Sequence, residues 1–208
     1  MKLQIMRAPL LILLATLPLA GAQPTGSNPA AALIGRWRSL ETSQGGIGAV
    51  YQFNFDGSID FSPGAIIDMP YRVEGDQLIL PSATTGGPEI KSTLTWPTNS
   101  MLRMSAQGQT EEYRRQGEAD PRDRLLGEWL TSREMNGRRM PVQMFFYPAG
   151  KSLLVIRFTN QHGRYSVANG RLIAQFGGRV GLEGTFDITN RVLSIHRKSG
   201  RVTKLARY

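Results

Sequence analysis

Cysteine is absent from the 208-residue chain. Its absence excludes disulfides, thiolate nucleophiles and cysteine-ligated metals, and also the lipidated cysteine of a bacterial lipoprotein. Histidine occurs only at His162 and His196, and neither lies two or four positions from another metal-ligating side chain. We therefore expect no metal site and no cofactor. His196 is predicted to be a solvated strand residue and His162 a loop residue.

Motifs that carry catalysis are also missing. The sequence has no Gly-x-Ser-x-Gly, no phosphate-cradling loop and no Ser-x-x-Lys. The glycine-rich stretches 44–48 and 84–89 lack a strand–loop–helix context and are predicted to be plain loops. Among the carboxylates of the first half, Asp56 and Asp76 fall in turns, where aspartate serves local hydrogen bonding. The sequence predicts no catalytic residues and a protein that is not an enzyme.

Long apolar runs are scarce, and the clearest one lies at the start of the chain. Lys2 and Arg7 precede an apolar stretch over residues 8–20, and the small-x-small pattern Ala20-Gly21-Ala22 follows it. This order predicts a cleaved signal peptide over residues 1–22, with an N-terminal anchor as the alternative. The run is shorter than the roughly 20 residues of a membrane-spanning helix. We expect a bacterial periplasmic or secreted protein with no membrane span in its mature chain, which begins with a linker over residues 23–32.

Acidic residues are few in the second half. Residues 33–116 carry seven basic and nine acidic side chains, whereas residues 125–208 carry fourteen basic and four acidic ones. The overall formal charge of +9 therefore belongs to the second half. Such an excess predicts positive potential over the outer surface of that half and favours anionic partners.

What the chain does contain is a repeated phrase. The stretch Leu33-Ile34-Gly35-Arg36-Trp37 recurs ninety-two residues later as Leu125-Leu126-Gly127-Glu128-Trp129. Phe53-x-Phe55 is matched by Phe145-x-Tyr147 with one extra residue in the following turn, and Tyr71-x-Val73 by Tyr165-x-Val167. Because the matches keep their order and nearly their offset, they indicate an internal duplication. We expect one unit over residues 33–116, a polar linker over 117–124 and a strongly basic second unit over 125–208.

Within each unit the apolar residues alternate with a period of two, and turn pairs such as Asp56-Gly57 and Asn169-Gly170 separate the runs. This pattern is typical of antiparallel hairpins. With about seven or eight short strands per unit, a meander can close on itself and remove its exposed edges. The predicted fold is all-β, with two tandem small antiparallel up-and-down barrels; one larger barrel with shared strands is the alternative.

The two Gly-x-Trp openings resemble those of the calycin superfamily, and most closely its short lipocalin-like bacterial domains. The resemblance implies that Gly35 and Gly127 let the backbone pass close to its neighbours and that Trp37 and Trp129 plug the barrel ends. It also implies a basic residue of the last strand stacked on each tryptophan. Arg114 or Arg115 would serve the first unit in this way, and Arg207 the second.

Three non-catalytic functions fit these observations. One is binding of a small apolar ligand inside a barrel, as the resemblance implies. A second is contact between the basic second barrel and an anionic lipid or glycan of the cell envelope. The third is a secreted inhibitor or interaction partner of another exported protein.

Nucleic acid is disfavoured as the partner, because the aromatic residues of the second half fall on the apolar side of the alternation. The residues expected to bind a ligand or anion are Arg138, Arg139, Arg197, Lys198, Arg201 and Lys204.

Overall fold

The computed structural model describes residues 29–82 and 87–208, which form sixteen strands and one short 3₁₀ helix, η1 (Ala31–Leu33). The predicted signal peptide lies outside the described residues. The all-β prediction is confirmed. In the part of the chain that the structure describes, no helix has the length and apolar character needed to cross a membrane.

The first eight strands are β1 (Gly35–Ser39), β2 (Ile47–Phe53), β3 (Ser58–Pro70), β4 (Arg72–Glu74), β5 (Gln77–Leu80), β6 (Ile90–Thr98), β7 (Met101–Ala106) and β8 (Gln109–Gln116). The other eight are β9 (Gly127–Met135), β10 (Arg138–Tyr147), β11 (Lys151–Arg157), β12 (Gln161–Ala168), β13 (Arg171–Phe176), β14 (Arg179–Thr189), β15 (Val192–His196) and β16 (Val202–Arg207).

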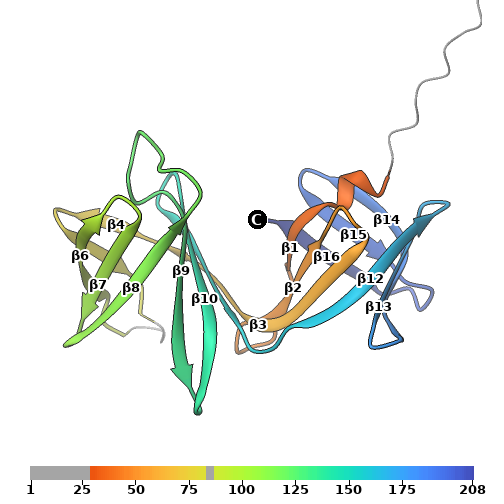
Figure 1. Cartoon of the computed structure of the whole chain (residues 1–208), viewed down its shortest axis with the longest axis horizontal. Coiled ribbons are helices and arrows are strands. Elements are labelled where there is room, and N and C mark those ends of the chain that lie inside the picture. The colour runs from red at the N-terminus through yellow and green to blue at the C-terminus, as the bar shows by residue number, and fades with distance from the viewer. Residues whose placement is uncertain (1–28, 83–86) are drawn as a thin grey trace, which may run out of the picture.

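Eight antiparallel strands close into a barrel, on the right of Figure 1. Their order is β12, β13, β14, β15, β16, β1, β2 and the first part of β3. The ring closes because β3 also pairs with β12, with Ile59 opposite Gly163. Alternate side chains point inward and form one apolar cluster that includes Trp37, Phe53 and Leu205. This closure satisfies the backbone groups that an open sheet would expose at its edges.

The other strands form a second lobe, on the left of Figure 1. The later part of β3 pairs with β11, and the order continues through β10, β9, β8, β7, β6 and β5 to β4. Only Tyr71 separates β3 from β4, and its N–H donates to the Gly150 carbonyl at 2.7 Å. The lobe has its own apolar cluster, which includes Tyr113, Trp129 and Phe146.

Strands from both predicted units build each lobe. β3 runs from the closed barrel into the second lobe, and the β11–β12 stretch runs back beside it in the opposite direction (Figure 1). As a result β1, β2 and the start of β3 complete the barrel made by β12–β16, while β9–β11 lie with β4–β8. The predicted linker, residues 117–124, joins β8 to β9, which are neighbours in one lobe.

The strand registers confirm that the two Trp phrases occupy equivalent positions. Gly35 lies opposite Phe53 and Gly127 lies opposite Phe146. Phe53 therefore corresponds to Phe146, so matching it to Phe145 was wrong by one residue. The extra residue of the second copy lies before this position, between Trp129 and Phe146, and not in the following turn.

The variable residue of Gly-x-Trp lies at the seam between the lobes. Arg36 Nη1 donates to Glu128 Oε1 at 2.6 Å, and Nη2 donates to Oε2 at 2.7 Å. The guanidinium also lies 5.3 Å from the ring centre of Phe145 and 5.4 Å from that of Tyr208. The two Trp phrases thus carry opposite charges at this position, and the difference forms a two-pronged ion pair across the seam.

Candidate functional site: a cavity and a basic surface

Each Trp of the repeated phrase is fully buried at one end of its lobe. The Trp37 indole N–H donates to the Leu33 carbonyl at 2.6 Å, and that of Trp129 donates to the Leu125 carbonyl at 2.8 Å. Gly35 has a φ of 124°, and a Cβ there would meet the Arg207 guanidinium at 3.2 Å. Glycine at this position therefore makes room for an arginine over the Trp ring, and Gly127 makes the same room for Arg115.

The arginines stack on the tryptophan of the other unit. Arg207 lies over Trp37 at 4.5 Å and Arg115 lies over Trp129 at 4.2 Å. Assigning Arg207 to the second unit's tryptophan was therefore wrong, because β16 pairs with β1 and β8 pairs with β9. The expectation that Arg114 or Arg115 covers the first unit's Trp37 was wrong as well, since Arg115 covers Trp129 and Arg114 is exposed on the opposite side of β8.

A cavity of about 710 Å³ lies in the second lobe. Met144, which pairs with Trp129 in the sheet, lines the cavity, and so does Gln107 of the β7–β8 turn. The apolar lining consists of Ile67, Met69, Pro70, Leu80, Pro81, Ile90, Met104, Ala106, Tyr113, Met144 and Leu154. The motifs in the sequence give no sign of this cavity, because its residues come from eight separate strands, the segment after β5 and the β7–β8 turn.

Three differences between the copies explain why this lobe is hollow. In the closed barrel, Tyr51 lies opposite Phe61 with ring centres 5.1 Å apart, and Phe61 contacts Phe176 at 5.5 Å. The equivalent pair in the second lobe is Met144 opposite Leu154. When β5 is aligned with β13, Ser82 stands at the position that Phe176 occupies in the closed barrel. Three aromatic rings that fill one lobe are thus replaced by smaller side chains, all of which line the cavity.

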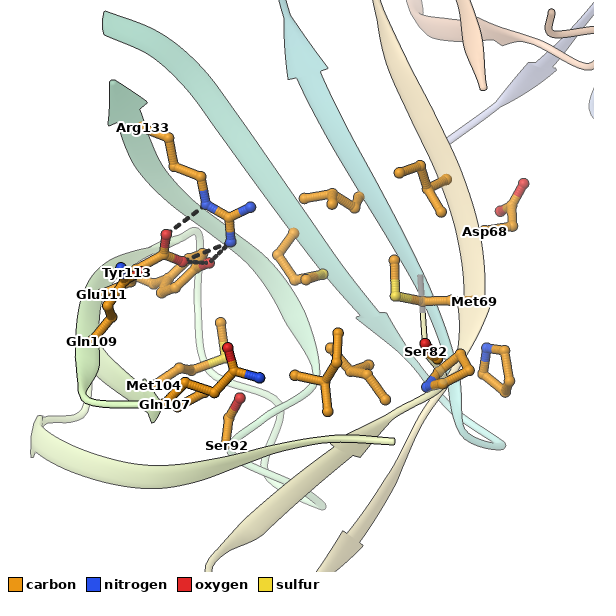
Figure 2. Close-up of a pocket in the computed structure, with 18 residues that line it drawn as sticks. Asp68, Met69, Ser82, Ser92, Met104, Gln107, Gln109, Glu111, Tyr113 and Arg133 are labelled. Carbon is orange, nitrogen blue, oxygen red and sulfur yellow. Dashed lines mark hydrogen bonds and ion pairs between the residues drawn. The ribbon is translucent and has the colours of Figure 1, made fainter. Parts of the chain in front are cut away.

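One polar cluster interrupts the apolar wall. Arg133 donates to Glu111 from Nε at 2.5 Å and from Nη2 at 2.7 Å, and the Tyr113 hydroxyl donates to Glu111 Oε2 at 2.6 Å (Figure 2). Burial raises the pKa of Tyr113, and its bond to Glu111 raises it further. Burial alone would raise the pKa of Glu111, but the two donors outweigh it and hold the pKa below its ordinary value. The cluster carries no net charge into the cavity.

The six predicted anion-binding residues fall into two groups. Arg138 and Arg139 begin β10 in the second lobe, whereas Arg197, Lys198 and Arg201 surround the β15–β16 turn of the closed barrel. Lys204 is exposed on the wall of β16. Among the described residues, none of the six makes an ion pair with a carboxylate.

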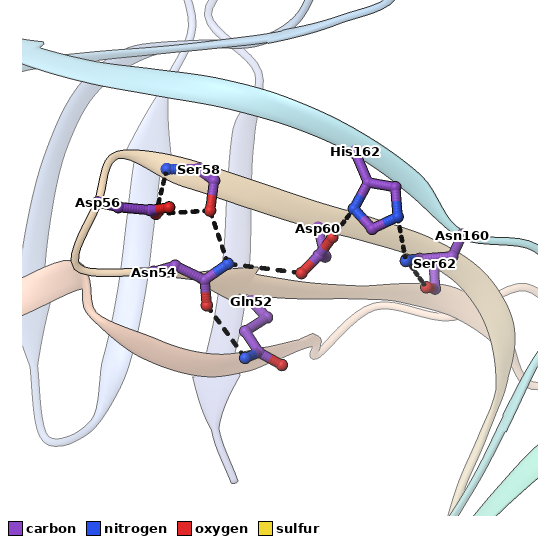
Figure 3. A network of polar contacts seen from close by, with 8 residues as sticks. All are labelled: Gln52, Asn54, Asp56, Ser58, Asp60, Ser62, Asn160 and His162. Carbon is purple, nitrogen blue, oxygen red and sulfur yellow. Dashed lines mark hydrogen bonds and ion pairs between the residues drawn. The ribbon is translucent and has the colours of Figure 1, made fainter.

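The two histidines are each paired with a carboxylate. His196 Nε2 lies 2.8 Å from Asp187 Oδ2, on the exposed wall of the closed barrel. His162 contacts Asp60 through Nδ1 and lies in β12, so the prediction of a loop residue was wrong (Figure 3). Within residues 29–82 and 87–208, no group of three or more His, Asp or Glu side chains could hold a metal ion.

Ser62 lies close to this histidine but is not bonded to it. The buried Ser62 hydroxyl donates to Asn160 Oδ1 at 2.9 Å, and the Asn160 amide nitrogen lies 3.4 Å from His162 Nε2 (Figure 3). A nucleophilic serine needs a direct hydrogen bond to its base. Here the Asn160 amide lies between the Ser62 hydroxyl and the His162 imidazole, so these side chains form a hydrogen-bond network that links β3 to β12.

No protein-family model matches the chain, and neither a curated protein nor a solved structure shows significant similarity to it.

Proposed function

We propose that the chain is an exported, non-catalytic binding protein whose second lobe holds a small apolar ligand. We treat the second lobe, which β4–β11 and the later part of β3 form, as the lipocalin-like counterpart of the closed barrel. The observation that carries it is the cavity of about 710 Å³ with its mainly aliphatic wall.

The size of the cavity fits this function. Pockets for small molecules commonly measure about 300–1,000 Å³ and have mostly apolar walls with a few polar groups. The apolar wall gains free energy when an apolar ligand removes it from water.

The wall chemistry indicates an uncharged ligand body. Arg133 and Glu111 neutralise each other, and both oxygens of Glu111 already accept hydrogen bonds. An ion placed deep in the cavity would lose its hydration without gaining an unpaired partner of opposite charge. Shape and apolar contact would therefore select the ligand.

The test fills the cavity with the side chains of the other copy. The change Met144→Tyr with Leu154→Phe places the closed barrel's aromatic pair in the second lobe. We expect wild-type protein to bind the neutral fluorescent probe N-phenyl-1-naphthylamine saturably, and the filled variant to lose at least about 10-fold in affinity because the probe's apolar contacts are removed.

The matched control makes the reverse exchange, Tyr51→Met with Phe61→Leu, in the closed barrel. Its probe affinity for the second lobe should stay within about 2-fold of wild type, since additivity holds for distant sites. Urea unfolding of both variants separates lost binding from lost folding. The proposal fails if wild-type protein shows no saturable binding, or if a folded filled variant binds as tightly as wild type.

A further inference from the structure

One side of the molecule gathers the turns at the ends of both lobes that lie away from Trp37 and Trp129. β3 runs down the closed barrel and then up the second lobe, and β11–β12 follows it in reverse, so these ends of both lobes lie on the same side (Figure 1, lower side). Successive turns of an up-and-down sheet alternate between its two ends. The turns on this side, which we name the tip face, include residues 40–46, 107–108, 136–137, 177–178 and 197–201.

Unpaired basic side chains flank these turns. They are Arg138, Arg139, Arg179, Arg197, Lys198 and Arg201, and among the described residues none makes an ion pair. The acidic residues of the same turns are Glu41 and Glu134. Some arginines elsewhere are neutralised, as with Arg72 by Glu89 and Arg103 by Glu112, and within the described part of the chain the tip face has no such pair at these six residues. The tip face therefore carries an excess positive charge that the protein itself does not balance.

Exposed apolar side chains lie beside the same turns. Of the seven large hydrophobic residues exposed among the described residues, four flank the tip face: Leu40 (45% exposed), Ile47 (48%), Met135 (38%) and Val180 (52%). Basic residues interleaved with exposed apolar ones at protruding turns suit the boundary between lipid headgroups and acyl chains. A purely polyanionic partner would use the charges and leave the apolar side chains in water.

We propose that the tip face docks on an anionic lipid bilayer, with the apolar tips inserted and the basic residues among the headgroups. The excess charge supplies the long-range attraction, and the four apolar side chains supply the contact that salt does not screen. This surface is distinct from the cavity and does not depend on the proposed ligand. In this orientation the β7–β8 turn that lines the cavity, with Gln107, also faces the bilayer.

The first experiment measures co-sedimentation of the full chain with vesicles. We expect binding to phosphatidylcholine vesicles that contain phosphatidylglycerol and little binding to pure phosphatidylcholine. The triple variant Arg138→Glu, Arg179→Glu and Lys198→Glu should bind on the order of 100-fold more weakly, since each basic residue near a charged surface contributes roughly 5-fold.

The matched control makes the same change of charge elsewhere. Arg114→Glu, Arg122→Glu and Arg191→Glu alter exposed residues on the wall of β8, in the 117–124 segment and in the β14–β15 turn. These substitutions should weaken binding far less than the tip variant does. Equal losses for the two variants would show attraction by net charge alone and would overturn the docking surface.

The second experiment uses the absence of native cysteine. Val180→Cys and Phe55→Cys each accept one environment-sensitive fluorophore, and Phe55 lies 91% exposed in the β2–β3 turn at the opposite end of the barrel. Anionic vesicles should shift the emission to the blue at position 180 and leave it unchanged at 55. A shift at 55 alone, no shift at either site, or retention on heparin without vesicle binding would overturn the proposal. Probe binding by the cavity, measured without lipid, reports on the proposed function separately.

Discussion

Glu111 accepts hydrogen bonds from two neighbours on the cavity wall, Arg133 and Tyr113. Their hydrogen bonds stabilise the ionised carboxylate more than the neutral acid. They therefore lower the pKa of Glu111 although burial opposes them. A group whose pKa is lower in the folded state stabilises the fold above its ordinary pKa, here 4.5, and loses that contribution as the pH falls through the folded value.

Glu111→Gln tests this balance. At neutral pH the variant should be less stable than wild type by about 1 kcal/mol, a modest figure because the pair is partly exposed. Below the folded pKa both proteins carry a neutral group at 111, so the difference should shrink. Urea unfolding at the two pH values measures it, with Glu112→Gln on the outer face of β8 as the control. A stability difference that grew on acidification would contradict the assigned hydrogen bonds.

β3 is the strand on which the connection between the lobes depends. It spans thirteen residues, and Gly64 lies at its middle, opposite Arg157 of β11. A Cβ at Gly64 would press against the Ile156 carbonyl oxygen and the backbone of Arg157. Backbone cannot swing aside as a long side chain can, so glycine is required here by close approach between strands.

We predict that Gly64→Ala destabilises the protein by about 1–3 kcal/mol or more through this overpacking. Gly45→Ala is the control, because a Cβ at Gly45 meets nothing nearer than the Ser43 hydroxyl at 4.0 Å. Thermal or urea unfolding gives both values. Equal stability of Gly64→Ala and wild type would mean that β3 and β11 are farther apart than the structure places them.

The molecule as a whole is held together by exchanged strands. Each lobe needs strands from both sequence units, the Trp37 and Trp129 rings are covered by arginines of the opposite unit, and Arg36 bonds Glu128 across the seam. The buried cluster of Val50, Ile66, Phe145, Leu153 and Val155 adds apolar contact between the lobes. Cutting the chain between the units therefore leaves these interactions intact.

A protease site placed within the exposed 117–124 segment tests this arrangement. After cleavage we expect the two pieces to elute together in native buffer, with an unchanged far-UV circular dichroism spectrum, and to separate only in denaturant. Arg36→Glu, which faces Glu128, should lower the denaturant concentration at which they part, because like charges would meet at the seam. Two compact pieces separating in native buffer would show independent tandem units instead.

Several features of the fold could be predicted because they are local. Period-two alternation and the turn glycines predict strands and hairpins, and the Gly-x-Trp phrases mark two equivalent, buried ring positions. The sequence also predicts that Arg207 stacks on a tryptophan, but it does not predict that this tryptophan is Trp37. A sequence pattern reports which residues can form a strand, and it does not report which copy of a duplicated strand will be its neighbour.

The cavity could not be predicted, although its cause is present in the sequence. Met144, Leu154 and Ser82 are ordinary residues in isolation, and their significance appears only beside Tyr51, Phe61 and Phe176 of the other copy. Matching Phe53 to Phe145 was off by one residue, which would have misaligned the comparison along β10. The register of the sheet corrects that alignment, since each residue has a defined partner across the strand.

The sequence by itself determined the all-β class, the repeated Trp phrase, the two tryptophan positions and the charge difference between the two halves, because each follows from residue type and spacing. Only the tertiary structure decided which strands share a lobe, which arginine covers which tryptophan, where a cavity remains and which turns share a face. The physical reason is that strand pairing joins residues far apart in the chain, and residue type and spacing do not specify which distant strand will be the neighbour.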